Sequence, residues 1–527
     1  MNRTITVALL ASTIVLAGCE DGDNGLNGED GMDGMDGLNS LVATRTIPVG
    51  DASCPGGGLA IDSGLDTDRN DTLDAGEVTA SETIDCSQAP MLRALHASPD
   101  APAVNIWVNG TPALTGVDYA AGSGFLPITT STRVQIEAII PGGNAIVIDE
   151  ARNFDFDTEH TFVAVGNVAD PIAGWIISND SDQPIGPGNI RAQVIHAAPG
   201  APIVDVYVTA PGADLAMASP INVDGFDYQD VTTRLEVPAG DYQIRITPEG
   251  DAATVAFDSG TLSLSVGADL LIAAIDKTGP GASPVQLVVM DGTAANTVLD
   301  ANTPASVVAV HASPDAPDVD ILADDLATAA DDAVTLALGA PFTAACEIGS
   351  VPAPASYTLN VTAAGDPSTV ALSFPFDAVV GSESTAIVTG LLTSTPAIQP
   401  IALATNTRSV ATETKLRITH AAASTDDVDL YLLPDGTMFM DASVEPSVPD
   451  VPFTADTEIM SIEPGIYDVY VTPAGTKATI AIEVPDLDLT AGQVLDIIAR
   501  DPADDGSEGT LPQLIVVDYA TVGACAT

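Results

Sequence analysis

Short segments in which apolar and polar residues alternate recur through most of the chain. In one of them, Leu416, Ile418 and His420 share one face of an extended strand, while Arg417 and Thr419 share the other face. Pro, Asp and Gly separate these segments and favour turns. No segment shows the long, uninterrupted apolar period of 3.6 residues that a major helix requires. The pattern therefore predicts an all-β protein.

One two-strand pattern occurs four times along the chain. Each copy has a strand that ends in His, a turn, and a second strand with Asn or Asp nine residues after the His. The histidines are His96, His196, His311 and His420, and the residues that follow them are Asn105, Asp205, Asp320 and Asp429. Successive histidines are 100, 115 and 109 residues apart. This spacing is the size of an immunoglobulin-like β-sandwich and exceeds that of a short solenoid repeat.

A second pattern recurs later in three of the four copies. Tyr242, Tyr357 and Tyr467 each stand at the start of an expected strand, after a corner that contains Pro. In Greek-key sandwiches such a tyrosine ties its hydroxyl to a backbone group, an arrangement called a tyrosine corner. The first copy has Val134 in this neighbourhood, so we expect it to be the most diverged.

These two patterns resemble a known family. The first copy reads H-A-S-P-D-A-P-A-V-N from His96 to Asn105, and the later strand of the second copy begins P-A-G-D-Y. Both resemble the domain-of-unknown-function 4397 family (DUF4397) of bacterial surface and secreted proteins, from about Ala89 to the end of the chain. The resemblance implies tandem β-sandwich modules and no known catalytic residue. The segment 41–87 resembles a small module that follows Gly-rich stalks in similar lipoproteins.

The N-terminus has the plan of a bacterial lipoprotein signal peptide. Arg3 precedes an apolar run from Ile5 to Leu16, which is too short to stay in a membrane as a spanning helix. The run ends in L-A-G-C, which matches a lipobox in which Cys19 is lipidated and becomes the new N-terminus. An ordinary signal peptide with an incidental Cys is the alternative. Glu20 in the next position favours the outer membrane as the destination.

Glycine occupies every third position from Gly22 to Gly37, and this run contains no Pro. The run predicts a flexible acidic stalk, and a short collagen-like stem is the alternative. We therefore predict a signal peptide at 1–18, the stalk at 19–40, a small module at 41–88, and four immunoglobulin-like β-sandwich repeats at 89–187, 188–302, 303–411 and 412–527.

The charge balance excludes one class of partner. The chain has 73 acidic and 15 basic residues, and its formal net charge is -58, which excludes a nucleic-acid-binding protein. Because 46% of the residues are hydrophobic, we expect folded domains with an acidic surface rather than a disordered chain. The expected partners are a membrane, through the N-terminal lipid, and another envelope protein or a polysaccharide.

Four cysteines remain once Cys19 is assigned to the lipid. An even number in an exported protein predicts disulfides, because that compartment is oxidising. Cys54 and Cys86 bracket one compact segment and form the simplest pair. Cys346 and Cys525 are left as a second pair by elimination, and their pairing requires the C-terminus to fold back onto an earlier module.

The acidic segment 66–77 has the ligand spacing of an EF-hand loop. Loop positions 1, 3, 5, 7, 9 and 12 are occupied by Asp66, Asp68, Asn70, Thr72, Asp74 and Glu77. Asp71 stands at position 6, where an EF-hand has glycine, and the preceding segment reads as strand or loop rather than helix. The spacing predicts a single calcium ion that stabilises the small module. A plain acidic surface loop is the alternative.

The recurring His and Asp have a structural interpretation and a chemical one. Each His lies on the apolar face at a strand end, directly before a turn whose backbone groups need partners. We therefore predict that each ring bonds to the turn backbone or to the Asp on the neighbouring strand. Contact with a ligand or metal and a catalytic role are the alternatives. Asn105 in the first copy indicates that the position does not require a charge.

The chain lacks the sequence signatures of common enzymes. It has no G-x-S-x-G, no H-E-x-x-H, no P-loop and no dinucleotide-binding fingerprint. We assign no catalytic residues and no cofactor other than calcium. The sequence predicts an exported, membrane-anchored scaffold, adhesion or interaction protein, exposed to the periplasm or on the cell surface. A polysaccharide-binding surface protein is the chief alternative, and a hydrolase with an unfamiliar site is the third hypothesis.

Overall fold

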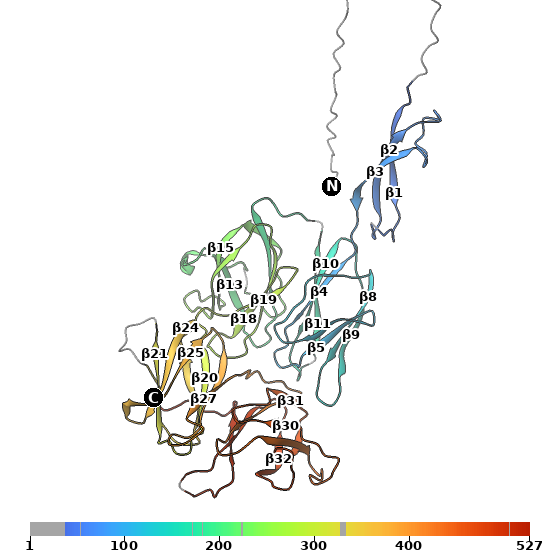
Figure 1. Ribbon diagram of the computed structural model, residues 1–527. Coiled ribbons are helices and arrows are strands. Elements are labelled where there is room, and N and C mark those ends of the chain that lie inside the picture. Colours follow the sequence, from blue (N-terminus) through green and yellow to red (C-terminus); the bar gives the residue numbers. More distant parts are fainter. Residues whose placement is uncertain are drawn as a thin grey trace, which may run out of the picture. The chain divides into compact units, whose positions relative to one another are not determined.

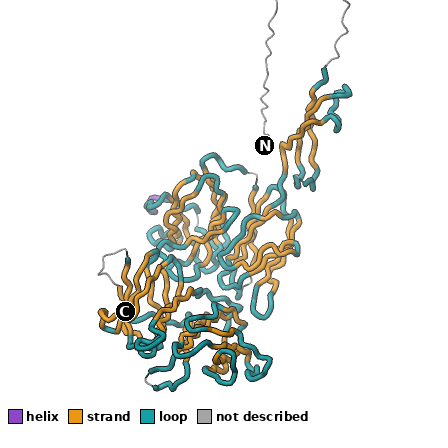
Figure 2. The backbone as a smooth tube through the Cα atoms, viewed as in Figure 1, coloured by secondary structure: helices purple, strands orange, loops and turns teal. Residues whose placement is uncertain are grey.

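The computed structural model describes residues 37–527, except residues 53, 171, 182, 223–224, 327–333 and 505. This part consists of β-strands, loops and one short 3-10 helix, Leu215–Met217, which confirms the all-β prediction (Figures 1 and 2). The predicted signal peptide, Cys19 and nearly all of the predicted stalk lie outside the described residues. Among the described residues, no helix has the length and the apolar character needed to cross a membrane.

The chain forms two compact units, Met1–Cys86 and Ser87–Thr527. The described part of the first unit is an antiparallel sheet of three strands in the order β1-β2-β3. These strands are β1 (Ser40–Ile47), β2 (Gly58–Leu65) and β3 (Val78–Cys86). The sheet has a small buried core, and the predicted disulfide between Cys54 and Cys86 is formed and is part of this core.

The described part of the second unit contains eight sheets that pack in pairs, and each pair encloses an apolar core. We name the pairs sandwich 1 to sandwich 4 in chain order. Sandwich 1 contains β4 (Met91–His96), β7 (Leu126–Pro127), β10 (Thr158–Val165) and β11 (Ala173–Asp180) in one sheet, and β5 (Val104–Val108), β6 (Thr111–Val117), β8 (Ser131–Ala138) and β9 (Ala145–Asn153) in the other. Sandwich 2 contains β12 (Asn189–His196), β14 (Leu235–Pro238), β17 (Asp269–Asp276), β18 (Val285–Met290) and β19 (Ala295–Val298) opposite β13 (Val204–Thr209), β15 (Gly240–Pro248) and β16 (Phe257–Leu264).

The later two sandwiches have four strands in each sheet. Sandwich 3 contains β20 (Ala305–His311), β23 (Ala345–Val351), β26 (Glu383–Thr389) and β27 (Gln399–Ala404) opposite β21 (Val319–Asp325), β22 (Val334–Ala340), β24 (Ala355–Ala363) and β25 (Asp366–Ala378). Sandwich 4 contains β28 (Thr414–Ala421), β31 (Met460–Ile462), β34 (Val494–Arg500) and β35 (Gln513–Asp518) opposite β29 (Val428–Pro434), β30 (Val448–Val451), β32 (Gly465–Pro473) and β33 (Ile482–Leu489).

The strand that ends in the recurring His has the same neighbours in all four sandwiches. It pairs in parallel with a strand from near the end of its sandwich, as β4 with β10, β12 with β17, β20 with β26, and β28 with β34. The other strand pairs of the sandwiches are antiparallel. The parallel pair therefore joins the beginning of each sandwich to its end and places the four histidines in equivalent surroundings.

The sandwiches are fused in two pairs by apolar contacts between sheets. In β28 all eight residues are buried, so this strand is covered on both faces. Leu416 and Ile418 belong to the core inside sandwich 4, whereas Ala421 and Ile498 share a second core with Val308 of sandwich 3. A core of the same kind joins sandwiches 1 and 2. Sheets covered on both faces carry nearly continuous apolar runs, as these strands do.

The C-terminal tail of sandwich 4 returns to sandwich 3. The predicted disulfide between Cys346 and Cys525 is formed, and it joins β23 to the tail. Next to it, the Glu347 backbone N–H donates to the Gly523 carbonyl at 2.8 Å, and the Cys525 N–H donates to the Glu347 carbonyl at 2.8 Å. The tail is therefore attached to sandwich 3 covalently and as a short parallel bridge.

Candidate functional site

The four recurring histidines make the same two hydrogen bonds. Each ring accepts at Nδ1 from the backbone N–H two residues on, at 3.3 to 3.4 Å. Each ring also contacts, through Nε2, the carbonyl oxygen six residues on, at 3.0 to 3.4 Å. An aromatic ring lies 6.0 to 6.2 Å from each imidazole. The imidazole thus bonds to the backbone at both ends of the turn between the two strands. This is the bonding to turn backbone that the sequence predicted.

The partners of each ring define its protonation state. A backbone N–H can only donate and a carbonyl can only accept, so Nδ1 is the acceptor and Nε2 carries the hydrogen. The four side chains are almost completely buried. Burial lowers the pKa of each ring below its usual value, although the carbonyl at Nε2 acts in the opposite direction. The neutral ring is therefore the form that the fold stabilises.

The Asp nine residues after the His does not contact the imidazole. Asp320 accepts from the backbone N–H of Gly339 at 2.7 Å and from that of Gly365 at 2.8 Å. Asp429 makes the corresponding pair of bonds in sandwich 4, to the N–H groups of Asp450 and Gly475. In sandwich 2 the carboxylate binds one backbone N–H and one side-chain amide. Each carboxylate thus joins the strands on its two sides, and of the two predicted partners of the His ring the turn backbone is used and the Asp is not.

Asn105 replaces the Asp in sandwich 1 and keeps half of this arrangement. Its Oδ1 accepts from the Gly116 N–H at 3.1 Å, which is the bond to the neighbouring hairpin. Its Nδ2 donates at 2.8 Å to the Glu137 carboxylate on the adjacent strand β8. The negative charge has moved to the neighbouring residue, which explains why the position tolerates an amide.

The three predicted tyrosine corners are present. The hydroxyls of Tyr242, Tyr357 and Tyr467 donate to backbone carbonyls four or five residues earlier, at 2.7, 3.0 and 2.8 Å. These tyrosines fix the corner that leads into β15, β24 and β32. The recurring polar residues of the repeats therefore hold backbone in place.

The acidic segment 66–77 connects β2 to β3 and gathers three carboxylates. One oxygen from each of Asp66, Asp68 and Glu77 lies within 4.8 Å of the others. Asp66 and Glu77 are buried, and Asp68 is exposed. Asp71, which replaces the glycine of an EF-hand, adopts a φ of 61° and thus takes the left-handed conformation that the tight turn requires. The loop lies in a β-hairpin rather than between helices.

Hydrogen bonds connect the remaining predicted ligands of this loop to the group. Asn70 donates through Nδ2 to Asp68 at 3.0 Å and to Asp74 at 2.9 Å, and its Oδ1 accepts from the Thr72 N–H at 2.7 Å. Hydrogen bonds, of which the Thr67 hydroxyl gives the strongest, lower the pKa of Glu77 to about 2. Burial and the neighbouring carboxylates raise the pKa of Asp68. A divalent cation would relieve this repulsion.

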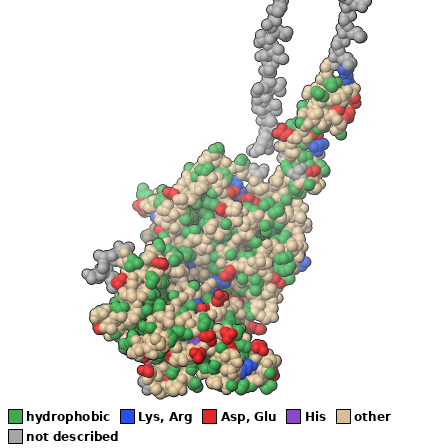
Figure 3. All heavy atoms as spheres, viewed as in Figure 1, with side chains coloured by type: hydrophobic (Ala, Val, Ile, Leu, Met, Phe, Trp, Pro, Cys, Tyr) green, Lys and Arg blue, Asp and Glu red, His purple; other side chains and the backbone are tan. Residues whose placement is uncertain are grey.

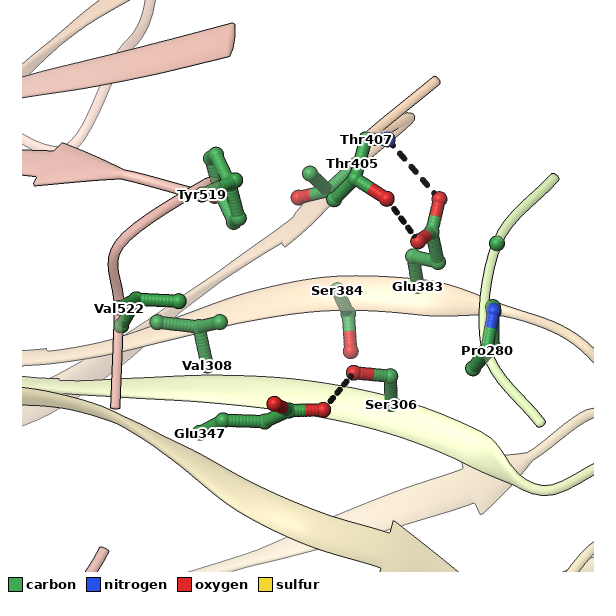
Figure 4. Close-up of a pocket in the computed structure, with 11 residues that line it drawn as sticks. Pro280, Ser306, Val308, Glu347, Glu383, Ser384, Thr405, Thr407, Tyr519 and Val522 are labelled. Atoms are coloured by element: carbon green, nitrogen blue, oxygen red, sulfur yellow. Dashed lines mark hydrogen bonds between the residues drawn. The ribbon is translucent and has the colours of Figure 1, made fainter. Parts of the chain in front are cut away.

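A cavity of about 220 Å³ opens at the edge of the contact between sandwiches 3 and 4 (Figure 4). Its floor is the sheet of sandwich 3, from which Glu347 of β23, Ser306 of β20 and Ser384 of β26 project. Tyr519 from the end of sandwich 4 and Pro280 from sandwich 2 form opposite walls. Sequence patterns did not reveal these residues, because they belong to none of the recurring motifs.

Two family models match the chain. The model described as Domain of unknown function (DUF4397) matches residues 90–207 and 305–431. The chain contains tandem DUF4397 repeats. Both matched regions begin at the first strand of one sandwich and extend into the second strand of the next. A further model, described as Domain of unknown function (DUF7151), matches residues 39–86, which include the acidic loop and the first disulfide.

The other comparisons add no functional argument. No curated protein matches the chain. A solved structure entitled "The Bacillus anthracis TIE protein" is 12% identical, covers 89% of this chain and 76% of its own, and has a TM-score of 0.14. Another, entitled "Alpha-glucan binding by a streptococcal virulence factor", is 11% identical, covers 35% and 93%, and also has a TM-score of 0.14. At these scores the likenesses carry no conclusion for the DUF4397 repeats.

Several of the few cations lie where one sandwich meets another. Arg93 of sandwich 1 reaches the Met290 carbonyl of sandwich 2, and Arg234 of sandwich 2 pairs with Glu159 of sandwich 1. Arg500 of sandwich 4 stacks 4.8 Å above a phenylalanine ring of sandwich 3. The visible face of the molecule shows more acidic than basic side chains (Figure 3). These arginines thus add polar contacts to the junctions that the apolar cores form between sandwiches.

Proposed function

We propose that the protein is an exported, lipid-anchored envelope protein that acts as a non-catalytic scaffold, adhesion or interaction protein. The observation that carries this proposal is the use of the same buried His in all four repeats to hold turn backbone. A reactive centre needs polar groups that are available to a substrate, whereas these groups are satisfied by the fold. The repeats are therefore best suited to present a binding surface to a partner.

The apolar contacts between sandwiches favour the role of a rigid scaffold. Apolar cores fuse sandwiches 1 and 2, and likewise sandwiches 3 and 4. Buried contacts of this kind resemble a domain interior rather than a flexible linker, so the loops of neighbouring repeats keep fixed spacing. A partner that touches several repeats would then bind without the entropic cost of ordering them.

The membrane anchor is tested by replacing the predicted lipidation site. We expect the mature wild-type protein to begin at Cys19, to carry lipid by mass spectrometry and to sediment with membranes. Cys19→Ser is expected to remove the lipid and release the protein into the soluble fraction. A wild-type protein without lipid would overturn the anchor.

The scaffold role is tested by binding of the purified mature protein to separated envelope fractions. Saturable binding to the protein fraction that disappears after that fraction is treated with protease supports an envelope protein as the partner. Saturable binding to purified polysaccharide alone would instead support the alternative function. Turnover of a polysaccharide or ester substrate by the purified protein would favour the hydrolase hypothesis.

Polysaccharide binding remains the alternative function of the repeats. Sugar-binding surfaces commonly use aromatic platforms, whereas the described Trp, Tyr and Phe residues are buried or half-buried. Trp175 and Tyr119 pack against the core between sandwiches 1 and 2. A polysaccharide would therefore have to be bound by polar groups, for which the cavity of Figure 4 is a candidate.

We also propose that the loop 66–77 binds one calcium ion that stabilises the N-terminal unit. The support is the group formed by Asp66, Asp68 and Glu77 and the left-handed turn at Asp71. Asn70 and Asp74 lie beside this group and can complete an oxygen-rich ligand set. The ion would serve structure, because the loop closes a hairpin that the Cys54–Cys86 disulfide already ties at its other end.

A further inference from the structure

The cavity at the edge of sandwich 3 contains two carboxylates that lack a cationic partner. Glu347 accepts a hydrogen bond of 3.1 Å from the Ser306 hydroxyl. Glu383 accepts one of 2.9 Å from the Thr407 N–H and another from the Thr407 hydroxyl. Among the described residues, no ion pair within 4.0 Å involves either carboxylate. Both side chains are only half-buried, so a ligand can reach them.

Two lysines, Lys277 and Lys415, interact electrostatically with Glu383, yet neither forms an ion pair with it within 4.0 Å. The Lys277 ammonium donates to the carbonyls of Gly279 and Pro280. These carbonyls hold the lysine in the loop that forms one wall of the cavity. The carboxylates of Glu347 and Glu383 are therefore available to a positively charged ligand in the cavity.

The rest of the lining supplies hydroxyls and apolar surface. Ser306 and Ser384 project from the floor between the two carboxylates, and Thr405 lies on the far wall (Figure 4). The Tyr519 hydroxyl is held at 2.5 Å from Asp496, so its ring is fixed as a wall. Hydroxyls can both donate and accept, which suits a ligand that itself carries hydroxyl groups.

The position of the cavity walls depends on the second disulfide. Val522 lines the cavity, and the chain three residues later is bonded to Cys346, the neighbour of Glu347. The two backbone hydrogen bonds between Glu347 and the tail hold the same wall. The cavity exists only because sandwiches 2, 3 and 4 contribute to it together.

We propose that this cavity binds a small ligand that carries a protonated amino group together with hydroxyl groups, the chemistry of an amino sugar. The amino group would donate to the Glu347 carboxylate, and hydrogen bonds between charged groups are the stronger kind. At about 220 Å³ the cavity is smaller than the roughly 300–1,000 Å³ of pockets for drug-sized molecules, so it fits a group of one ring. The net charge of -58 also attracts a cation. This site depends neither on the lipid anchor nor on the calcium loop.

The first test compares three probes on the intact mature protein by calorimetry or NMR titration. Glucosamine is expected to bind saturably. Glucose, which lacks the amino group, and N-acetylglucosamine, which lacks the charge, are expected to bind at least about tenfold more weakly. Equal binding of all three, or no binding of glucosamine, would overturn the proposal.

The second test removes single groups from the cavity. Glu347→Gln is expected to weaken glucosamine binding at least about tenfold. Glu82→Gln is the matched control, because it removes the same charge from an exposed position on β3, and its affinity should equal that of the wild type. The Ser384 hydroxyl makes no hydrogen bond to another described residue, so Ser384→Ala should weaken binding several-fold at an unchanged melting temperature. Wild-type affinity in both cavity variants would place the ligand elsewhere and refute the assignment.

Two further measurements ask whether the carboxylates bind a metal ion rather than an amino group, and whether the disulfide is needed for binding. Calcium chloride at the concentration of the sugar should not displace glucosamine, and displacement that requires Glu347 would assign the carboxylates to a metal ion and overturn the proposal. The double variant Cys346→Ser, Cys525→Ser should bind glucosamine more weakly than the wild type, because it releases the wall that carries Val522. Unchanged affinity in this variant would contradict the proposed cavity.

Discussion

The guanidinium of Arg408 donates a hydrogen bond of 2.8 Å to the carbonyl of Ala101, which lies 307 positions earlier in the chain. Arg408 belongs to the segment between sandwiches 3 and 4, and Ala101 lies in the His-containing turn of sandwich 1. The same guanidinium pairs with Asp118 at 2.5 Å and lies 5.6 Å from the centre of the Tyr119 ring. This buried arginine thus fastens the first repeat to the last pair of repeats, together with the Ala411 N–H, which donates to the Asp100 carbonyl at 2.8 Å.

Replacing this arginine should weaken the attachment of sandwich 1. Arg408→Met leaves the Ala101 carbonyl without a partner, so we expect a loss of about 1–3 kcal/mol in the free energy of unfolding. We also expect the calorimetric transition to broaden or divide, because the two pairs of sandwiches would unfold less cooperatively. Arg152→Met, at an exposed ion pair, is the control and should change stability by less than about 1 kcal/mol. Identical effects of the two substitutions would contradict the proposed attachment of sandwich 1 through Arg408.

Arg417 and Asp496 form a buried ion pair on the face of sandwich 4 that packs against sandwich 3. Their side chains are 2% and 4% exposed, and the two residues lie opposite each other on β28 and β34. Asp496→Asn leaves the arginine charge uncompensated, so we expect a loss of about 3–5 kcal/mol in chemical denaturation. The matched control is Asp149→Asn at the exposed pair with Arg133, where we expect a loss of about 1 kcal/mol or less.

The His of each turn should be required for stability and not for binding. His311→Ala leaves the Ser313 N–H and the Pro317 carbonyl without their partner, so we expect a loss of about 1–3 kcal/mol in the free energy of unfolding. Denaturation by urea measures this loss. A variant that kept its full stability but lost its envelope partner would show that the ring serves a ligand.

Acid should destabilise the repeats through the same rings. Burial holds the pKa of each ring below the 6.5 of an unperturbed histidine. Below pH 6.5 the unfolded chain therefore binds protons that the folded chain excludes, and the free energy of unfolding falls as the pH falls. The loss ends once the pH is below the pKa of the folded state. Because His311→Ala removes one such ring, the stability of this variant should change less than that of the wild type between pH 7.5 and pH 5.5. Equal changes would show that the buried histidines do not cause the loss of stability in acid.

Chelation of calcium should affect the N-terminal unit alone. We expect EDTA to lower the melting temperature of the transition that belongs to this unit and to leave the transition of the four sandwiches unchanged. Glu77→Gln should remove the response to calcium, because it replaces a ligand that a bidentate site requires. Glu82→Gln on the exposed face of β3 is the control and should keep the response. A wild-type protein that ignores both calcium and EDTA would exclude the site.

The sequence by itself predicted the features that depend on short stretches of chain. Alternation of apolar and polar residues identifies strands, because side chains of a strand point to opposite faces. The turn after each His and the corner before each Tyr involve partners within six residues, so their repetition was enough to predict structural roles. The six candidate ligands of the loop 66–77 could be identified in the same way, because their spacing is a local property of the sequence. The Cys346–Cys525 pair was also predictable, because elimination needs no geometry.

The tertiary structure decided which surfaces meet. In β28 the alternation suggested a polar face with Arg417 and Thr419, yet both are buried, because sandwich 3 covers that face. The parallel pairing of first and late strands, the partners of Asp320, and the cavity around Glu347 likewise depend on segments tens to hundreds of residues apart. A local pattern records the direction of a side chain and its polarity. It does not record what packs against it, because that is set by the fit between whole folded surfaces.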